Sequence, residues 1–278
     1  RSFRRAAAQL AVSPAAVSKA VQTLEASLKV QLLARDARNV SLTPEGALFF
    51  ERARAAVAEV TGAREALEPV GRVPEGQLVV SLPFVLTGLV ARGLALLRAR
   101  HPKLTFAVAV TDQLSRLGAE PIDVAVRVGR LAESRLIART LRQTQLLTVA
   151  SPAYLARRGR PTRLDELAEH DCLGLVAPNG KPHPWWFKSG PRPIASVIDL
   201  QHGPMLFDAV LAGMGISQVF DFMAAERLRS GELVQLFAPE TAAGPEIHAV
   251  CAPGRRATPR VRAAFEAFAD AFSRATLG

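Results

Sequence analysis

The chain has 278 residues, and its 35 Lys and Arg residues outnumber the 25 Asp and Glu residues to give a net charge of +10. That length suggests two domains, and a hydrophobic fraction of 49% is sufficient for large cores. The sequence has no apolar run of about 18 residues, so we expect neither a transmembrane helix nor a membrane partner.

Cysteine usage limits the chemistry further. Cys172 and Cys251 are too few and too far apart in sequence for a disulfide scaffold or a zinc site. They fit a reducing cytoplasm, in which a buried cysteine usually behaves as a small hydrophobe. Redox sensing by this pair remains an alternative.

Residues 2–28 contain two short helical patterns on either side of a tight turn. Apolar residues of the first recur at the helical period, behind Ser2 as N-cap: Phe3, Ala6, Ala7 and Leu10. The second opens with Ser13 as N-cap and Pro14 as its first helical residue. Its apolar residues follow the same period: Val17, Val21, Leu24 and Leu28. This spacing indicates a helix-turn-helix, although an αα-hairpin inside a larger core has the same pattern.

The outward face of the second helix is suited to DNA. Its side chains are small or polar, with no carboxylate before Glu25, so it can enter a major groove without repelling phosphates. We predict that the DNA-facing residues of this segment are Ser13, Ala15, Ala16, Ser18, Lys19 and Gln22. The stretch after Lys29 predicts a short β-wing. Residues expected to hold phosphates are Arg4, Arg5, Arg35 and Arg38. Residues 1–54 carry nine basic and four acidic residues, a concentrated positive charge that favours duplex DNA.

A long helix is expected from Pro44 to about Pro69. Its apolar residues form a heptad seam: Phe49, Ala53, Ala56, Val60, Ala63 and Leu67. We expect this seam to pair with the same helix of a second copy, which would place two recognition helices on two half-sites. Packing against its own chain is the alternative. Two prolines and two glycines within residues 69–76 then mark a hinge.

The remaining chain, 77–278, alternates predicted strands with predicted helices. Strands are expected at 77–82, 104–110, 122–128 and 146–150, among others. Helices are expected at 86–100, 113–117, 204–213, 222–230 and 258–274. Such alternation is typical of an α/β fold with a mostly parallel sheet, and about 200 residues fit two small lobes.

The whole chain resembles the LysR-type transcriptional regulators. The resemblance rests on SFRRAAAQLAVSPAAVSKAVQTLE, LLAR around Arg35, LTPEG at 42–46, and stretches such as IDVAVRVG and ASPAYLARRGRP in the C-terminal part. Lys29 stands where the family usually has Gly, and Leu33 where it has Phe. The family also has a further helix before Phe3 that this sequence lacks, so we expect a loosely packed DNA-binding domain.

The resemblance implies an α-helical winged helix-turn-helix domain with a long linker helix, followed by a two-lobed α/β effector domain like a periplasmic binding protein. We assign 1–43 to the DNA-binding domain, 44–70 to the linker helix, 71–76 to the hinge and 77–278 to the effector domain. Lobe one would be 77–146 and 253–278, and lobe two 147–252. The implied partners are promoter DNA, a small-molecule effector, a second copy in a dimer or tetramer, and RNA polymerase, in a bacterial cytoplasm.

An effector in such a fold should lie beyond the carboxyl ends of strands, where helices begin. The predicted effector-binding residues are Ser81, Pro83, Phe84, Thr87, Arg127, Gly129, Ser151, Gln201, His202 and Phe220. Structural roles are the alternatives: ion pairing for Arg127, hydrogen bonding for His202, helix capping for Ser81 and Ser151, and core packing for Phe84 and Phe220.

No motif of catalysis is present. The sequence lacks GxGxxG opening a βα unit, a P-loop, HExxH and GxSxG, and its five histidines have no metal-ligand spacing. We therefore expect neither an enzyme nor a cofactor or metal site. Besides the regulator, a small-molecule sensor without DNA binding remains an alternative.

Overall fold

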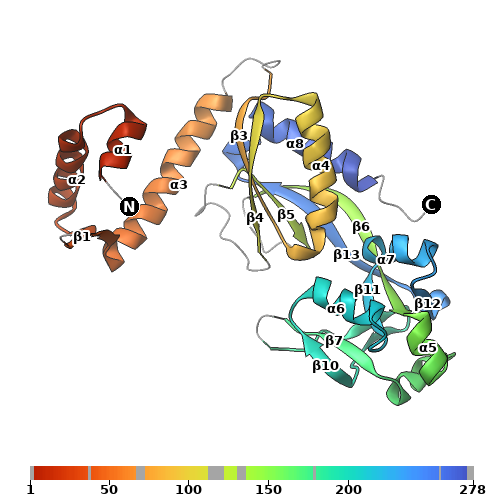
Figure 1. The fold of residues 1–278 in the computed structure, drawn as a ribbon. Helices are drawn as coiled ribbons and strands as arrows, with labels where there is room; N and C mark the ends of the chain where they lie inside the picture. Colours follow the sequence, from red (N-terminus) through yellow and green to blue (C-terminus); the bar gives the residue numbers. More distant parts are fainter. Residues whose placement is uncertain are drawn as a thin grey trace. The chain divides into compact units, whose positions relative to one another are not determined.

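The computed structural model describes residues 3–36, 39–66, 73–111, 122–129, 136–177, 180–256 and 258–273. The chain divides into two compact units (Figure 1), an N-terminal unit that ends at Thr61 and a C-terminal unit that contains both lobes. The predicted helix at 113–117, the N-cap Ser2 and the phosphate candidate Arg38 lie outside the described residues. In the described part of the chain, no helix has the length and apolar character needed to span a bilayer.

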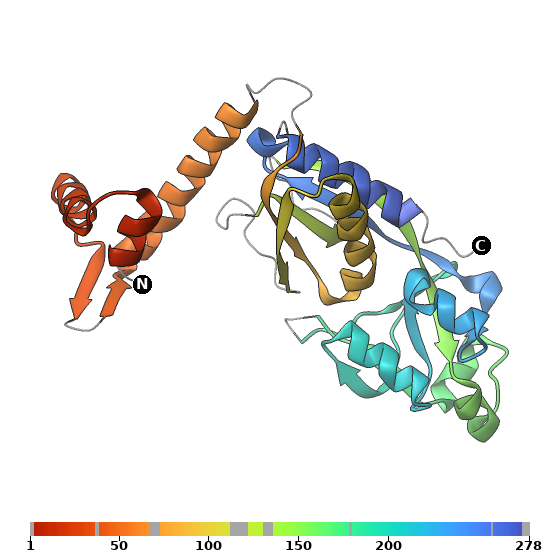
Figure 2. The ribbon, with the colours of Figure 1, turned by 45° about the horizontal axis from the view of Figure 1, so that its top comes forward.

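The N-terminal unit is a helix-turn-helix with a two-stranded wing. Its elements are α1 (Phe3–Leu10), α2 (Pro14–Leu28), β1 (Leu33–Asp36), β2 (Asn39–Leu42) and α3 (Pro44–Ala66). Strands β1 and β2 are antiparallel, as Figure 2 shows. The predicted start of α2 is confirmed: the Ser13 hydroxyl accepts the backbone N–H of Ala16 at 3.1 Å, and Pro14 is the first helical residue.

Two residues with left-handed backbone conformations flank α2. Ala11, in the turn after α1, has a φ of 53°, and Lys29, the C-cap of α2, has a φ of 56°. A left-handed conformation costs an L-residue roughly 1–2 kcal/mol, which glycine avoids. The structure therefore explains why a glycine is expected at the position of Lys29.

Side chains from α2 and from the start of α3 fix the wing. The Glu25 carboxylate accepts the backbone N–H groups of Leu32 at 2.8 Å and Leu33 at 3.0 Å. The Thr43 hydroxyl donates to the Gln31 carbonyl and accepts the N–H of Gly46, capping α3. A Cβ on Gly46 would lie 1.8 Å from the Leu32 carbonyl oxygen, so the LTPEG stretch needs this glycine for close backbone approach.

One sheet runs through the C-terminal unit in the order β11-β6-β13-β5-β3-β4, with β12 also on β6. Its strands are β3 (Gly76–Leu82), β4 (Leu104–Val110), β5 (Val124–Val128), β6 (Ile137–Ala150), β11 (Ser217–Phe220), β12 (Val234–Leu236) and β13 (Ala242–Cys251). β3 pairs in parallel with β4 and β5, but every pairing of β6 and β13 is antiparallel. The prediction of a mostly parallel sheet is therefore wrong, because two long antiparallel strands connect the lobes.

Lobe one packs two helices on one face of its strands. They are α4 (Thr87–Arg100), preceded by the 3-10 turn η1 (Phe84–Leu86), and α8 (Pro259–Ser273). Three phenylalanines of α8, Phe265, Phe268 and Phe272, are fully buried in this core. Figure 2 shows α4 beside α8, and Gly93 permits that approach, because a Cβ there would lie 2.4 Å from the Phe268 ring.

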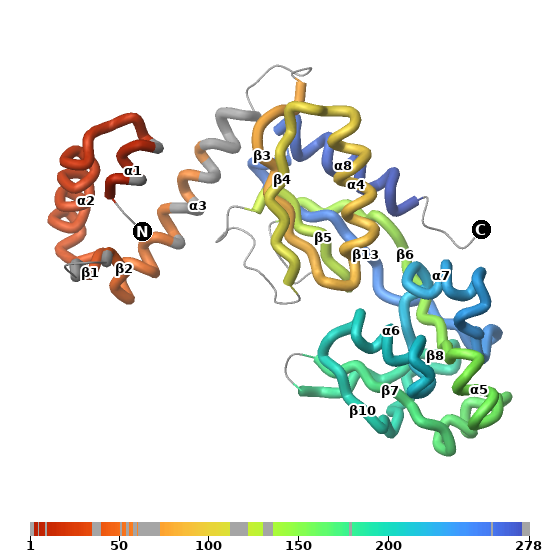
Figure 3. Tube along the Cα trace, viewed as in Figure 1, coloured from red at the N-terminus to blue at the C-terminus, as the bar shows by residue number. Residues whose placement is uncertain are grey.

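Lobe two is built around the distal half of β6, which the tube in Figure 3 shows entering that lobe. It adds a parallel pair, β7 (Cys172–Leu175) and β10 (Ser196–Leu200), and a hairpin of β8 (Trp185–Phe187) and β9 (Gly190–Arg192). Its helices are α5 (Pro152–Arg158), α6 (Gly203–Leu211) and α7 (Asp221–Arg229), with 3-10 turns η2 (Leu164–Glu169) and η3 (Ala238–Glu240). A further turn, η4 (Pro253–Arg255), leads from β13 back to α8.

The crossing between the lobes differs from the predicted limits. β13 pairs with β5 from Ile247 to Val250, so these residues belong to the lobe-one sheet. Strands of lobe two join β6 only from Leu146 onward. We therefore place the crossings near 143–146 and 243–246, the second several residues before the predicted return at 251–253, because β13 stays in the lobe-one sheet to its end.

Candidate nucleic-acid interface and effector site

Helix α2 presents distinct faces, because successive residues are about 100° apart around a helix. Ser18 and Gln22 share one face with Ala15, whereas Ala20 and Leu24 lie about half a turn away. Lys19 stands between these two faces. The face with Ser18 and Gln22 carries no carboxylate, and Glu25 is engaged by the backbone of the wing.

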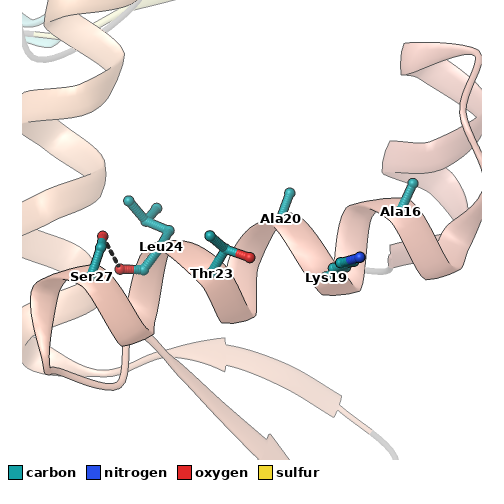
Figure 4. Close-up of a pocket in the computed structure, with 6 residues that line it drawn as sticks. All are labelled: Ala16, Lys19, Ala20, Thr23, Leu24 and Ser27. Carbon is teal, nitrogen blue, oxygen red and sulfur yellow. Dashed lines mark hydrogen bonds between the residues drawn. The ribbon is translucent and has the colours of Figure 1, made fainter.

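The face with Ala20 and Leu24 borders a shallow, open depression of about 590 Å³ (Figure 4). Its lining residues are Ala16, Lys19, Ala20, Thr23, Leu24 and Ser27. The Ser27 hydroxyl donates to the Leu24 carbonyl at 2.8 Å, which turns its polar group back onto the helix. Two predicted DNA-facing residues, Ala16 and Lys19, therefore also border this mostly apolar depression.

The described side chains among the DNA candidates are accessible. Those that are exposed are Arg4, Ser13, Ala15, Ala16, Lys19 and Gln22, whereas Ser18 is half-buried. Arg5 lies in α1 and Arg35 in β1, but their side chains fall outside the description. Accessibility on a capped helix is what a DNA-binding role requires, and the individual residue roles stay predictions.

The linker helix α3 has apolar side chains that are exposed to solvent. Val57 and Val60 are exposed, as are Leu48 and Phe50 nearer its start. Of the predicted seam residues, Phe49 and Ala53 are half-buried. Exposed apolar side chains on α3 are what the predicted pairing with a second copy requires, and the pairing itself stays a prediction.

Three of the predicted effector residues meet where the two lobes touch. The rings of Phe84, from lobe one, and His202, from lobe two, lie edge to face with centroids 4.9 Å apart. The Thr87 hydroxyl donates to the Phe84 carbonyl at 3.0 Å. His202 also caps α6, because its Nδ1 accepts the backbone N–H of Met205 at 3.1 Å. The hydrogen-bonding alternative for His202 is thus confirmed, while core packing does not describe Phe84, which is exposed.

Ser81 and Arg127 form a second pair, inside lobe one. The Arg127 guanidinium donates to the Ser81 hydroxyl at 3.0 Å and to the Val126 carbonyl at 3.2 Å. Both side chains are buried, on the neighbouring strands β3 and β5. Helix capping by Ser81 is wrong, because the residue lies within β3 and Pro83 precedes η1. Gly129 follows β5 with a φ of 88° and donates its N–H to the Glu246 carbonyl.

The other predicted effector residues lie elsewhere. Ser151 is buried and caps α5 by accepting the N–H of Tyr154 at 3.3 Å, so the capping alternative is confirmed. Phe220 stacks on Phe222, with centroids 5.4 Å apart. Gln201 is exposed directly before the α6 cap.

Sequence reasoning missed a buried ion pair between Arg142 and Asp221 at the crossing of the lobes. A strand prediction that began at 146 left Arg142 outside any element. The sequence offered little signal, because the apolar residues of IARTLRQTQL do not alternate with polar ones.

Both cysteines are poor candidates for redox chemistry. Burial raises the pKa of the Cys172 thiol to about 12 and that of Cys251 to about 11. A reactive cysteine needs a lowered pKa and access, which neither thiol has. Among the residues that the structure describes, no group of three or more His, Cys, Asp or Glu side chains is arranged to hold a metal ion.

A basic helix-turn-helix unit joined to a two-lobed α/β unit defines the class: a DNA-binding regulator with a sensory domain. Comparison with known families gives the particular family. A profile described as LysR substrate binding domain matches residues 71–273, and one described as bacterial regulatory helix-turn-helix protein, lysR family, matches residues 1–47. The chain therefore belongs to the LysR family of transcriptional regulators, and it is not an enzyme.

Two relatives and one solved structure support the same family assignment. The chain is 36% identical over 245 residues to the HTH-type transcriptional regulator CrgA of Neisseria meningitidis serogroup B, covering 86% of this chain and 81% of CrgA. It is 33% identical to the regulator DmlR of Escherichia coli K12, over 84% of this chain and 78% of DmlR. The solved structure of CrgA superimposes with a TM-score of 0.67 at 32% identity, covering 97% of this chain and 93% of that one.

Proposed function

We propose that this regulator binds promoter DNA as a dimer or tetramer and responds to a small-molecule effector held where its lobes meet. In this proposal α2 enters the major groove with Ser18, Lys19 and Gln22 toward the bases. The wing and α1 contact phosphates, and α3 pairs with its counterpart in a second copy. RNA polymerase is a further proposed partner, and a promoter-binding role implies the bacterial cytoplasm.

The observation that carries the proposal is the α2 helix itself. It begins at a Ser13–Pro14 cap, exposes Lys19 and Gln22, and belongs to a segment with nine basic and four acidic residues. A protein that neutralises phosphates releases counterions, so its affinity falls linearly on a log–log plot against salt. That dependence separates DNA binding from a sensor without it.

The test is a fluorescence-anisotropy titration of the full chain with duplex DNA fragments at rising salt. We expect affinity to fall steeply with salt, and Lys19→Ala to weaken binding at every salt concentration. Lys103→Ala, an exposed lysine of the C-terminal unit, is the matched control and should leave binding unchanged. A folded chain with no salt-dependent affinity for any fragment would favour the sensor instead.

The effector half of the proposal rests on the residues that meet between the lobes. Phe84 and His202 supply aromatic edges from opposite lobes, and Thr87 lies at the start of α4. A ligand can shift the regulator between states only if it binds those states with different affinities. Contacts to both lobes provide such a difference, because the geometry of the pair depends on the lobe angle.

A further inference from the structure

The two strands that connect the lobes are held together by backbone pairing and by a side-chain hydrogen bond. Figure 1 shows β6 and β13 passing side by side from one lobe to the other, and their register shifts between Ala243 and Glu246. The buried Thr144 hydroxyl donates to the Pro245 carbonyl at 2.7 Å. A Cβ on Gly244 would lie 2.4 Å from the Thr144 hydroxyl oxygen, so a larger residue at this bulge would have to displace that hydroxyl from its hydrogen bond.

An ion pair spans this crossing. Arg142 lies on the lobe-one side, where β6 faces Ile247 of β13, and Asp221 is the first residue of α7 in lobe two. Their side chains are 8% and 5% exposed, and the guanidinium binds one carboxylate oxygen. The other oxygen accepts the backbone N–H of Gln145 at 3.2 Å, so one carboxylate holds β6 at two points.

A neighbouring side chain crosses between the lobes. Phe222 belongs to α7 of lobe two, yet its ring packs against the hydrophobic core of lobe one. The Arg142 guanidinium lies 6.0 Å from the centroid of this ring, and Phe220 stacks on the same ring. Rotation of one lobe against the other would withdraw Phe222 and separate two buried opposite charges.

We propose that Arg142, Asp221 and Phe222 act as an interlobe pin, which fixes the lobe angle that the effector must change to alter DNA binding. The inference rests on the proposed function, because it names how the effector site is coupled to the rest of the molecule. Breaking a buried ion pair leaves an uncompensated charge, so lobe angles between the pinned and the rotated state are costly. The two states are therefore discrete. Arg142 and Asp221 are positioning residues in this account, since no effector contact is assigned to them.

The test measures the lobe angle directly in the full chain. Spin labels on Ala95→Cys in lobe one and Ala168→Cys in lobe two report the interlobe distance by pulsed EPR, with unlabelled chain added to dilute contacts between copies. Both sites are exposed, whereas the native thiols are buried and should resist labelling. We expect one narrow distance distribution for the parent chain and a second population for Asp221→Asn.

Two further variants keep the result interpretable. Phe222→Leu removes the ring without leaving a buried charge. It should produce the same second population, so the test remains decisive even if Asp221→Asn fails to fold. Arg227→Gln removes the exposed ion pair with Glu232 at the other end of α7, and it should leave the distribution unchanged. Unchanged distances in both pin variants would overturn the inference, whatever the DNA result.

DNA affinity supplies the regulatory readout. Coupling between sites typically changes affinity about five- to 150-fold, so we expect Asp221→Asn or Phe222→Leu to shift duplex affinity at least about fivefold. A shifted distance with unchanged affinity would overturn the coupling. If no variant and no parent chain binds DNA, the proposed function fails, while the distance measurement still decides whether the pin exists.

Discussion

The two units of this regulator are stabilised in different ways. Among the described residues of the N-terminal unit, the buried apolar side chains are Ala7 and Leu32, while Leu10, Leu48 and Val60 are exposed. Lobe one of the C-terminal unit buries three phenylalanines of α8 completely. The N-terminal unit therefore leaves apolar surface exposed, and if a second copy covers it as proposed, the stability of this unit should be linked to that partner.

The largest effect is expected in the core of lobe one. Phe268→Ala removes a fully buried ring between α4 and α8, and should cost about 3–5 kcal/mol of unfolding free energy. Urea unfolding followed by tryptophan fluorescence measures it, because both tryptophans, Trp185 and Trp186, lie in the C-terminal unit. Phe50→Ala, an exposed position on α3, should leave that transition in place. Equal losses in both variants would contradict the contrast between the units.

A smaller loss of stability is expected for a substitution in the N-terminal unit. Gly46→Ala places a methyl group against the Leu32 carbonyl and should destabilise this unit by about 1–3 kcal/mol, as overpacking does. We expect DNA affinity to fall while the tryptophan-reported transition stays unchanged. Gly88→Ala is the matched control, since a Cβ there meets nothing within 4 Å and alanine favours the helix. A shifted tryptophan transition in Gly46→Ala would show that the units do not unfold separately.

The seam of α3 can be tested at two exposed valines. Val60→Asp puts a charge on the predicted seam and should weaken dimerisation at least about tenfold, because a buried unpaired charge is costly. Val57→Asp, at a flanking position, should weaken it less. Sedimentation velocity across a concentration series gives the dimerisation constants of both variants. Equal dimerisation of both variants and the parent chain would mean that copies associate elsewhere.

The strained turn before α2 offers a stabilising change. Ala11→Gly relieves a φ of 53° and should stabilise the N-terminal unit by roughly 1 kcal/mol. Ala8→Gly, at an exposed position within α1, should instead cost about 1 kcal/mol. Thermal unfolding followed by circular dichroism compares the two variants. A change of the same sign in the stability of both variants would show that the backbone conformation at Ala11 is not strained.

The smallest effect concerns the thiols. Burial raises the pKa values of Cys172 and Cys251 to about 12 and about 11, so the folded state retains these protons more tightly than the unfolded state. Their contribution to stability is present below the ordinary thiol pKa and is lost as pH rises through these values. At pH 8 we expect no reaction with a thiol reagent until urea unfolds the C-terminal unit. Rapid reaction in the native protein would return redox sensing as an alternative.

The sequence alone predicts what local rules determine. Ser13 and Pro14 begin α2 as expected, and the helical periods locate α3, α4 and α8, because caps and periodicity act over a few residues. The antiparallel course of β6 and β13 was missed, since strand direction depends on pairing between distant segments. Arg142 and Asp221 are 79 residues apart, so no local pattern joins them. Ser81 and Arg127 were both named, but their contact needed the register of β3 against β5.

The most direct measurement is hydrogen exchange of the full chain with and without duplex DNA. We predict that amides of α2 exchange rapidly in the free chain and become protected when DNA is added. Amides of α8 should exchange slowly in both conditions, because that helix is held by the lobe-one core. Slow exchange of α2 in the free chain, or DNA-dependent protection that leaves α2 unchanged, would contradict the claim that the stability of the N-terminal unit is linked to its partners.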